Sequence, residues 1–277
     1  MSDRATGPSG LERIAIAFER ARGEGRAALM PYLMGGYPDL ETSRAVARAY
    51  ARAGADLIEL GAPYSDPLAD GPTIHAAATE ALRAGTTLDD VLGVCAEISA
   101  EVPVLPMVYA NMALSRGAER FAEDLADAGA CGAIIPDLPP SEDAELPGAL
   151  AERGLTMIPF VTPTTSPTRR KRIAGDARGF IYIVSLTGVT GERGALPGEL
   201  EELVRVTREA AEVPCAVGFG ISTPERAAEV GALADGVIIG SRLVRVAGEA
   251  ADADAAADQV REFIESCLAA MAPAEAA

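Results

Sequence analysis

The sequence predicts an α/β fold, a single (β/α)8 TIM barrel, and three observations support this prediction. Short runs rich in Val and Ile recur along the 277 residues, and a stretch with helical spacing follows each run. The runs are apolar on both faces, which is typical of parallel strands covered by helices. Eight such units in roughly 250 residues match the size of this barrel. A doubly wound open sheet is the alternative, but Gly35-Gly36-Tyr37-Pro38 after the first run does not fit its Gly-rich fingerprint.

The elements alternate along the whole chain. The predicted strands are residues 28–34, 56–60, 104–109, 132–136, 155–161, 180–186, 215–219 and 236–239. Apolar residues near helical spacing predict helices between them, most clearly at 40–53, 121–128 and 200–211. An extra helix at 11–22 precedes the first strand, and we expect it to close the bottom of the barrel. The last predicted helix spans residues 256–271.

We predict one catalytic domain, the barrel at residues 11–271, because no linker divides the chain. Residues 1–10 and 272–277 are expected to be disordered tails. The formal net charge of −17 leaves no basic surface for nucleic acid or an anionic membrane. No apolar run approaches the roughly 18 to 20 residues of a membrane span, and residues 1–10 lack the basic and apolar blocks of a signal peptide. We therefore expect a cytoplasmic protein.

Rare residue types narrow the chemistry. The single lysine, Lys171, lies in a charged run that opens a predicted surface helix, so a desolvated Schiff-base lysine is not expected. The single histidine, His75, excludes a His cluster for a metal and is expected on a helix surface. The four cysteines are widely spaced, without a C-x-x-C pair, and are predicted to be packing residues. Acid-base work in an enzyme of this composition falls to carboxylates and tyrosines.

Two turns at the end of the barrel suggest a phosphate site. Gly220 follows the seventh strand, where Ser222 and Glu225 have the spacing of a capping box. Gly240 and Ser241 follow the eighth strand and lead into a short helical piece at 242–246. Glycines allow backbone N–H groups to approach an oxyanion, and helix N-termini attract it. Ordinary tight turns remain the alternative, although turns after strands seven and eight are the usual phosphate position in this barrel.

A third loop and three carboxylates complete the candidate site. The loop at 186–194, with Gly191 near its middle, suits a lid that closes over a substrate. Alternation along residues 56–60 places Glu59 on the side opposite Ile58 and Leu60, so Glu59 projects into the barrel if those two face helices. Burial there should raise the proton affinity of Glu59, as a general acid requires. The alternative is a glutamate at a strand end that reaches solvent or pairs with an arginine. Asp66 and Asp70 follow in a loop where turn formation is the alternative role.

Several motifs together resemble one family. The stretch ELGAPYSDPLADGP at residues 59–72 is similar to the signature of the tryptophan synthase alpha chain family. GVTG at 188–191, GFGIS at 218–222, VYAN at 108–111 and the Gly240-Ser241 pair match that family in order and spacing. The similarity extends from about residue 11 to residue 263.

The resemblance implies a lyase that cleaves indole-3-glycerol phosphate into indole and glyceraldehyde 3-phosphate, a retro-aldol step without metal or cofactor. It assigns acid-base catalysis to Glu59, recognition of the indole nitrogen to Asp70, and a place beside Glu59 to Tyr182. The indole is expected near four residues, Tyr32, Met107, Tyr109 and Ile134. The phosphate is expected at Gly191, Gly220, Gly240 and Ser241, with Thr190 on the closing loop.

The resemblance also implies a partner, a pyridoxal-phosphate beta chain in an α2β2 complex. The expected contacts are Asp66 and Pro67 in the loop after the second strand, Asn111, and the segment from Pro136 to Pro139. Two alternatives stay open: a free-standing lyase, and a weakly active subunit that mainly activates a beta chain. The chain departs from the family at Tyr32, where many members carry Phe, and after Gly191, where the loop is about two residues shorter.

Overall fold

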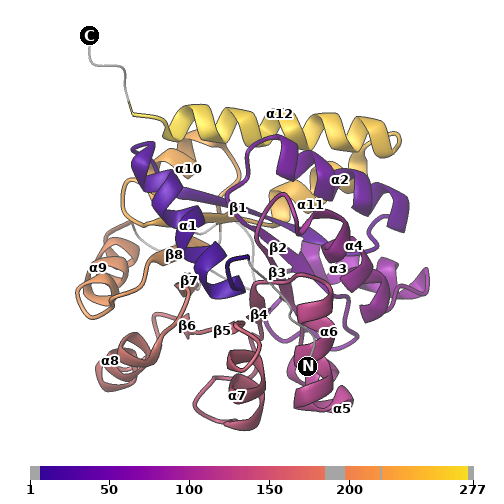
Figure 1. Ribbon diagram of the computed structural model, residues 1–277. Helices are drawn as coiled ribbons and strands as arrows, with labels where there is room; N and C mark the ends of the chain where they lie inside the picture. Colours follow the sequence, from indigo (N-terminus) through magenta and orange to yellow (C-terminus); the bar gives the residue numbers. More distant parts are fainter. Residues whose placement is uncertain (1–6, 185–196, 219, 274–277) are drawn as a thin grey trace.

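The structure, a computed structural model, describes residues 7–184, 197–218 and 220–273, and in these ranges the strands form one parallel sheet (Figure 1). The strand order is β5-β4-β3-β2-β1-β9-β8-β7-β6. The strands are β1 (Ala28–Met34), β2 (Ile58–Gly61), β3 (Val104–Met107), β4 (Gly132–Ile134), β5 (Thr156–Ile158), β6 (Phe160–Val161), β7 (Ile181–Val184), β8 (Cys215–Gly218) and β9 (Gly236–Ile239). This order is that of a nearly closed barrel, so the predicted (β/α)8 architecture is confirmed.

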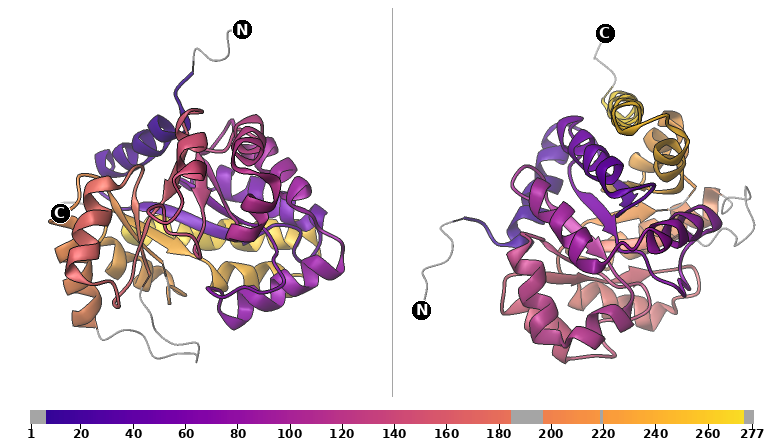
Figure 2. Two further views of the ribbon diagram at one scale, coloured as in Figure 1. Left: turned by 90° about the horizontal axis from the view of Figure 1, so that it is seen from below. Right: turned by 90° about the vertical axis from the view of Figure 1, so that its right-hand side faces the viewer.

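Helices surround the strands in all views (Figure 2). They are α1 (Gly10–Gly23), α2 (Leu40–Arg52), α3 (Pro72–Arg83), α4 (Leu88–Ile98), α5 (Ala110–Arg116), α6 (Ala118–Asp127), α7 (Glu145–Ala151), α8 (Pro167–Asp176), α9 (Pro197–Arg208), α10 (Pro224–Gly231), α11 (Ser241–Glu249) and α12 (Ala253–Met271). The last of these, α12, packs against α2, α10 and α11 and is seen end on in the right-hand view of Figure 2. Asp252 caps α12, which therefore begins three residues earlier than the sequence predicts.

The fifth predicted strand is broken in two, which corrects the count of eight. Pro159, which has no N–H to donate to a strand ladder, separates β5 from β6. β5 pairs with β4, and β6 pairs with β7, so the two ends of the sheet are joined through this one residue. The carbonyl of Pro159 still accepts a hydrogen bond from the Tyr182 N–H at 2.9 Å. The chain itself therefore closes the barrel at Pro159.

Two other predicted strands extend too far at their carboxyl ends. β3 ends at Met107 because Tyr109 is already the N-cap of α5, and β4 ends at Ile134 before Pro136. The predicted ends of the sixth and seventh strands, at 185–186 and 219, lie outside the described residues. These differences leave the order and direction of the strands unchanged.

The extra helix α1 covers the amino-terminal end of the barrel, as the sequence predicts (Figure 1). Ile14 and Phe18 pack with Leu57 and Phe180 in the cluster that fills the barrel interior, and the Phe18 and Phe180 rings lie 5.5 Å apart. Ser9 forms a capping box with Glu12, so the helix starts one residue before the predicted boundary. The tail predictions for 1–6 and 274–277 fall outside the described residues.

A buried aspartate anchors the start of β2 at the same end. Asp56 is fully buried and accepts hydrogen bonds from Arg20 at 2.8 Å, from Arg26, and from the Leu29 N–H at 2.8 Å. Removing one member of such a buried pair leaves an uncompensated charge, which costs about 3–5 kcal/mol. This network fixes the strand that carries Glu59 three residues later.

Each of the four cysteines is buried and free, in agreement with the predicted packing role. None of the helices in the described parts of the chain is long and apolar enough to cross a membrane.

Candidate active site

Glu59 lies inside the barrel, in the middle of β2. Its neighbours Ile58 and Leu60 pack in the outer cluster between strands and helices, so alternation turns Glu59 inward. Its exposed fraction is only 2%. The Tyr182 hydroxyl on β7 donates a hydrogen bond to Glu59 Oε2 at 3.4 Å. The two side chains reach each other across the barrel from strands far apart in the sequence.

Burial controls the charge of Glu59. Desolvation, together with the nearby charge of Asp70, raises the pKa of Glu59 to about 8, while the Tyr182 hydrogen bond acts in the opposite direction. The carboxyl is therefore mostly protonated at neutral pH. A protonated carboxyl that can give up its proton near pH 7 has the property of a general acid.

Asp70 lies in the loop after β2, half-buried and close enough to affect Glu59. Burial raises the pKa of Asp70 to about 6, and the Tyr109 hydroxyl and the charge of His75 partly oppose this rise. Asp70 is therefore mostly ionised at neutral pH. The loop is fixed next to Asp70, because the Ala69 N–H donates to the Tyr109 hydroxyl at 3.1 Å. His75 is exposed on α3, as expected, yet its charge reaches the site.

Two buried tyrosines complete the cluster around these carboxyls. The pKa of Tyr182 is raised well above its usual value by burial and then by Glu59. The pKa of Tyr32 is raised well above its usual value by burial and then by Asp70 and Glu59. Both phenols therefore stay protonated and can donate hydrogen bonds. Tyr32 and Glu59 are paired residues of neighbouring strands.

Two glycines make room for the tyrosines, and sequence reasoning did not assign them this role. A Cβ on Gly61 would lie 2.1 Å from the Tyr32 hydroxyl oxygen, and a Cβ on Gly218 would lie 2.5 Å from that of Tyr182. Phe160 was also missed. Its ring stacks on Tyr182 with centroids 4.9 Å apart. Only the register of neighbouring strands reveals these contacts.

The residues expected around the indole lie on neighbouring strands. Met107 of β3 pairs with Gly61 on one side and with Ile134 of β4 on the other. Both pack against the interior cluster. Tyr109 follows β3, and its ring stacks on Tyr64 with centroids 5.0 Å apart. An aromatic and apolar wall therefore continues from Glu59 towards the loop of Asp70.

The turns expected to bind phosphate follow the adjacent strands β8 and β9. Gly220 has φ +70°, a conformation that favours glycine. Gly240 is the N-cap of α11 and forms no side-chain cap, and Ser241 is the first residue of that helix. The first N–H groups of α11 thus lack a side-chain acceptor of their own cap, which suits an anion. Helix α11 is longer than the predicted piece at 242–246.

The predicted capping box at Ser222 and Glu225 is wrong. The N-cap of α10 is Thr223, whose hydroxyl accepts from the Arg226 N–H at 3.3 Å. Pro224 takes the first helical position, which shifts the cap to the residue immediately before it. Thr190 and Gly191, together with the whole predicted lid, lie outside the described residues.

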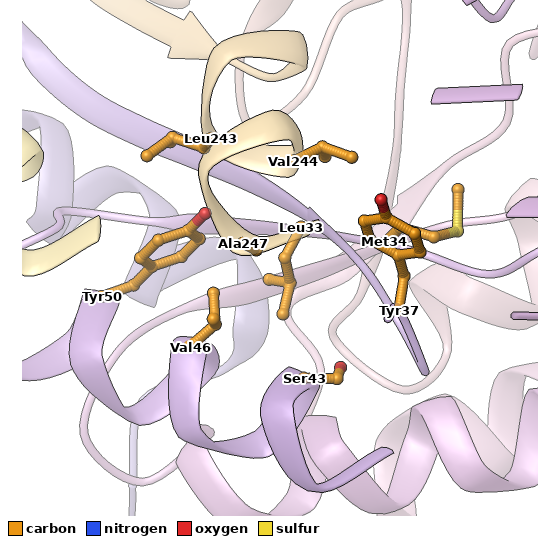
Figure 3. Close-up of a pocket in the computed structure, with 9 residues that line it drawn as sticks. All are labelled: Leu33, Met34, Tyr37, Ser43, Val46, Tyr50, Leu243, Val244 and Ala247. Carbon is orange, nitrogen blue, oxygen red and sulfur yellow. The ribbon is translucent and has the colours of Figure 1, made fainter. Parts of the chain in front are cut away.

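A small cavity lies between β1, α2 and α11, close to the turn at Gly240 (Figure 3). Its volume is about 10 Å³, which is too small for the substrate. Tyr50 lines it and donates a hydrogen bond to the Tyr32 carbonyl at 3.1 Å. Within the described residues the Ser43 hydroxyl in this cavity has no hydrogen-bond partner. The cavity belongs to the layer that supports β1 rather than to the site.

The residues expected to contact a partner lie around Tyr109. Asp66 and Asn111 are exposed and Pro67 and Pro139 are partly exposed. The Asp137 side chain accepts a hydrogen bond from the Ala110 N–H at 2.8 Å, which ties the segment before Pro139 to the start of α5. The Ala69–Tyr109 bond ties the loop of Asp66 to the same place. Among the described residues, no three His, Cys, Asp or Glu side chains gather where they could bind a metal ion.

Comparisons with known proteins agree with this geometry. The model of the family "Tryptophan synthase alpha chain" matches residues 18–272. The tryptophan synthase alpha chain of Synechococcus elongatus is 49% identical over 237 residues, which are 84% of this chain and 89% of that protein. The alpha chain of Chloroflexus aggregans is 48% identical with the same two coverages.

Solved structures give the same result. A chain of Mycobacterium tuberculosis tryptophan synthase superposes with a TM-score of 0.88 at 37% identity and covers 97% of this chain and 100% of that one. Tryptophan synthase subunit alpha from Legionella pneumophila has a TM-score of 0.84 at 34% identity, with coverages of 94% and 98%. The chain therefore belongs to the tryptophan synthase alpha chain family.

Proposed function

We propose that this chain cleaves indole-3-glycerol phosphate into indole and glyceraldehyde 3-phosphate, as a lyase of L-tryptophan biosynthesis, with Glu59 as the acid and base. The observation that carries the proposal is the Glu59 carboxyl, buried inside the barrel and hydrogen-bonded to Tyr182, where burial raises its pKa to about 8. A retro-aldol cleavage at an indole needs a proton to be given to carbon and another to be taken from oxygen, and one carboxyl with a raised pKa can do both in turn.

In the first step Glu59 gives its proton to indole C3. The ring then carries a positive charge on its nitrogen, and the carbon-carbon bond to the glycerol chain can break. In the second step the Glu59 carboxylate takes the proton of the hydroxyl on the adjacent carbon. That carbon becomes an aldehyde, and the electron pair of the broken bond returns to the ring and neutralises it. One proton is given and one is taken, so Glu59 ends in its starting state.

Asp70 has the complementary role. Its ionised carboxylate accepts the indole N–H and stabilises the positive charge that develops on the ring. The lower pKa of Asp70, about 6 against about 8 for Glu59, supports this division between an ionised and a protonated carboxyl. Tyr182 holds the Glu59 carboxylate through its hydroxyl while the proton is absent. Tyr32, Met107, Tyr109 and Ile134 supply the surface against which the indole packs.

The phosphate binds at Gly220, Gly240 and Ser241, with Thr190 and Gly191 contributed by the loop after β7. Helix α11 starts at Ser241 without a side-chain cap among the described residues, which supports this placement. Because the whole molecule is strongly acidic, the phosphate depends on these local donors rather than on long-range attraction.

A beta chain is the proposed partner, in an α2β2 complex formed through the loop of Asp66 and Pro67, Asn111 and the segment ending at Pro139. Two hydrogen bonds support a common surface, because they connect these segments around Tyr109. We place the protein in the cytoplasm, where a chain with four free cysteines stays reduced.

The replacement Glu59→Gln tests the catalytic proposal. Gln can neither give nor take a proton, so we expect indole release to fall by about 10³-fold or more. The affinity for glycerol phosphate should stay within about twofold, because the phosphate turns are untouched. Indole release followed by absorbance and binding followed by calorimetry check the two parts.

The matched control is Glu19→Gln, an exposed glutamate on α1 at the other end of the barrel. It should leave indole release unchanged. Near-normal turnover of Glu59→Gln would remove Glu59 from the mechanism.

A further inference from the structure

The Tyr32 hydroxyl is buried without a strong acceptor. Tyr32 is only 4% exposed, and among the described residues the one hydrogen-bond contact of its hydroxyl is Met34 Sδ at 4.0 Å. A thioether is a weak acceptor, and a buried phenol normally has a hydrogen-bond partner. An unmade bond of this kind costs free energy, so the position calls for an explanation.

The ring of Tyr32 cannot easily turn away. It packs with Met34, Ile74 and Val244 in one cluster. Its hydroxyl fills the space left by Gly61, and Tyr50 holds its carbonyl from behind. The donor is therefore fixed towards the barrel interior. Glu59 is the residue paired with Tyr32 on the neighbouring strand, and the charges of Asp70 and Glu59 raise the pKa of Tyr32.

The place of β1 in the sheet defines what Tyr32 can reach. β1 lies between β9, which leads into the phosphate turn, and β2, which carries Glu59. Tyr32 pairs with Glu59 on one side, and a Cβ on Gly240 would lie 3.7 Å from the Tyr32 Cβ on the other. The part of the substrate between the phosphate and the scissile bond is the glycerol chain. In this arrangement the glycerol chain passes Tyr32.

Only one polar group of the substrate's glycerol part lacks an assigned partner. Glu59 takes the proton of the hydroxyl next to the indole, and the turns hold the phosphate. We propose that the Tyr32 hydroxyl donates a hydrogen bond to the middle hydroxyl of the glycerol chain and thereby selects substrates that carry it. This inference rests on the proposed function, and it makes Tyr32 a specificity-determining residue rather than only an aromatic surface.

The test compares two substrates and two enzymes. The substrates are indole-3-glycerol phosphate and its analogue without the middle hydroxyl, and the enzymes are the natural chain and Tyr32→Phe, which keeps the ring. The natural enzyme should lose about tenfold in kcat/KM on the analogue. Tyr32→Phe should show the same loss on the full substrate and no further loss on the analogue, because the same bond is already absent.

The control variant is Tyr50→Phe, which removes a buried tyrosine hydroxyl behind β1. It should leave the ratio between the two substrates unchanged. Equal losses of Tyr32→Phe on both substrates, or no loss on either, would overturn the inference.

Calorimetric Kd values in a Glu59→Gln background separate this inference from the proposed function. There the ratio of the two affinities should be about tenfold with Tyr32 and close to one with Phe. Discrimination in binding without cleavage by the natural enzyme would reject the reaction and keep the Tyr32 contact. Cleavage by the natural enzyme without discrimination in binding would keep the reaction and reject the Tyr32 contact.

Discussion

At the scale of single residues, the site depends on two carboxyls that carry different charges at the same pH. Glu59 is almost fully buried, whereas Asp70 is half-buried and lies near Tyr109 and His75. Burial disfavours the charged form of both, but more strongly for Glu59. The ionised Asp70 then raises the pKa of Glu59 further. Each carboxyl therefore helps to define the role of the other.

The pH dependence of kcat/KM should show this pair. Activity needs Asp70 ionised, so it should rise as the pH increases through about 6. Activity also needs Glu59 protonated, so it should fall as the pH increases through about 8. The profile should be a bell with its maximum near pH 7, and its two apparent pKa values belong to the coupled pair.

Steady-state indole release at several pH values measures this profile. The residual activity of Asp70→Asn gives a further check. Loss of the Asp70 charge lowers the pKa of Glu59, so the falling limb should move to lower pH. A flat profile from pH 6 to 9 would contradict the assignment of acid and base.

At the scale of elements, the same arrangement positions both buried tyrosines. Tyr32 lies two residues before Met34, which pairs with Gly61 of the next strand. Tyr182 lies two residues before Val184, which pairs with Gly218 of the next strand. In both cases the ring reaches along the strand to the glycine, which has no side chain to obstruct it. The glycine on one strand thus sets the position of a hydroxyl from its neighbour.

Gly218→Ala should therefore reduce catalysis through Tyr182. The new Cβ would lie 2.5 Å from the Tyr182 hydroxyl oxygen, so the phenol must move away from Glu59. A misplacement of about 1 Å can lower kcat by about 10²-fold. Loss of the Tyr182 hydrogen bond should also raise the pKa of Glu59 and move the falling limb of the pH profile upwards.

Gly93→Ala is the matched control. Gly93 lies in α4, and nothing lies within 4 Å of a Cβ built there. This variant should keep full activity and gain up to about 1 kcal/mol of stability from helix propensity. If Gly218→Ala lowered kcat without moving the pH profile, Tyr182 would not act through Glu59.

Sequence patterns predicted the elements well because each strand and helix has its own local period. Alternation in β2 placed Glu59 inside the barrel on the condition that Ile58 and Leu60 face helices, and the structure meets that condition. The break at Pro159 could not be located so simply, because proline is tolerated at strand edges and the edge depends on the whole sheet. The roles of Gly61 and Gly218 depend on register between strands, which no local pattern contains. Thr223 replaced Ser222 as the cap because Pro224 fixed the first helical position.

At the scale of the whole molecule, the two ends of the barrel have different tasks. The amino-terminal end holds α1 and the Asp56 network, which stabilise the fold. The carboxyl ends of the strands hold Glu59, Asp70, the turns proposed to bind phosphate and the proposed partner surface. A change at the first end should affect stability, and a change at the second should affect activity or association.

The proposed partner surface includes a large apolar side chain that is unusually exposed. Leu68, in the loop between Asp66 and Asp70, is 87% exposed. Burying a leucine in an interface contributes about 1.5–3 kcal/mol. We therefore expect Leu68→Ala to weaken binding of a beta chain by about tenfold or more, while indole release by the isolated chain stays nearly the same.

The matched control is Ile16→Ala, because Ile16 is 53% exposed on α1 at the opposite end of the barrel. It should leave association unchanged.

Binding is measured by calorimetry, and indole release is measured with and without the beta chain. If the beta chain strongly stimulates indole release, and Leu68→Ala weakens this stimulation while Ile16→Ala preserves it, the protein is the two-subunit enzyme. Both variants shorten a side chain of the same size to Ala, so only a partner that binds the Leu68 loop can distinguish them. A high unassisted rate without stimulation selects the free-standing lyase. If Glu59→Gln still activated the beta chain fully while indole release was negligible even in the natural complex, the chain would act mainly as an activator.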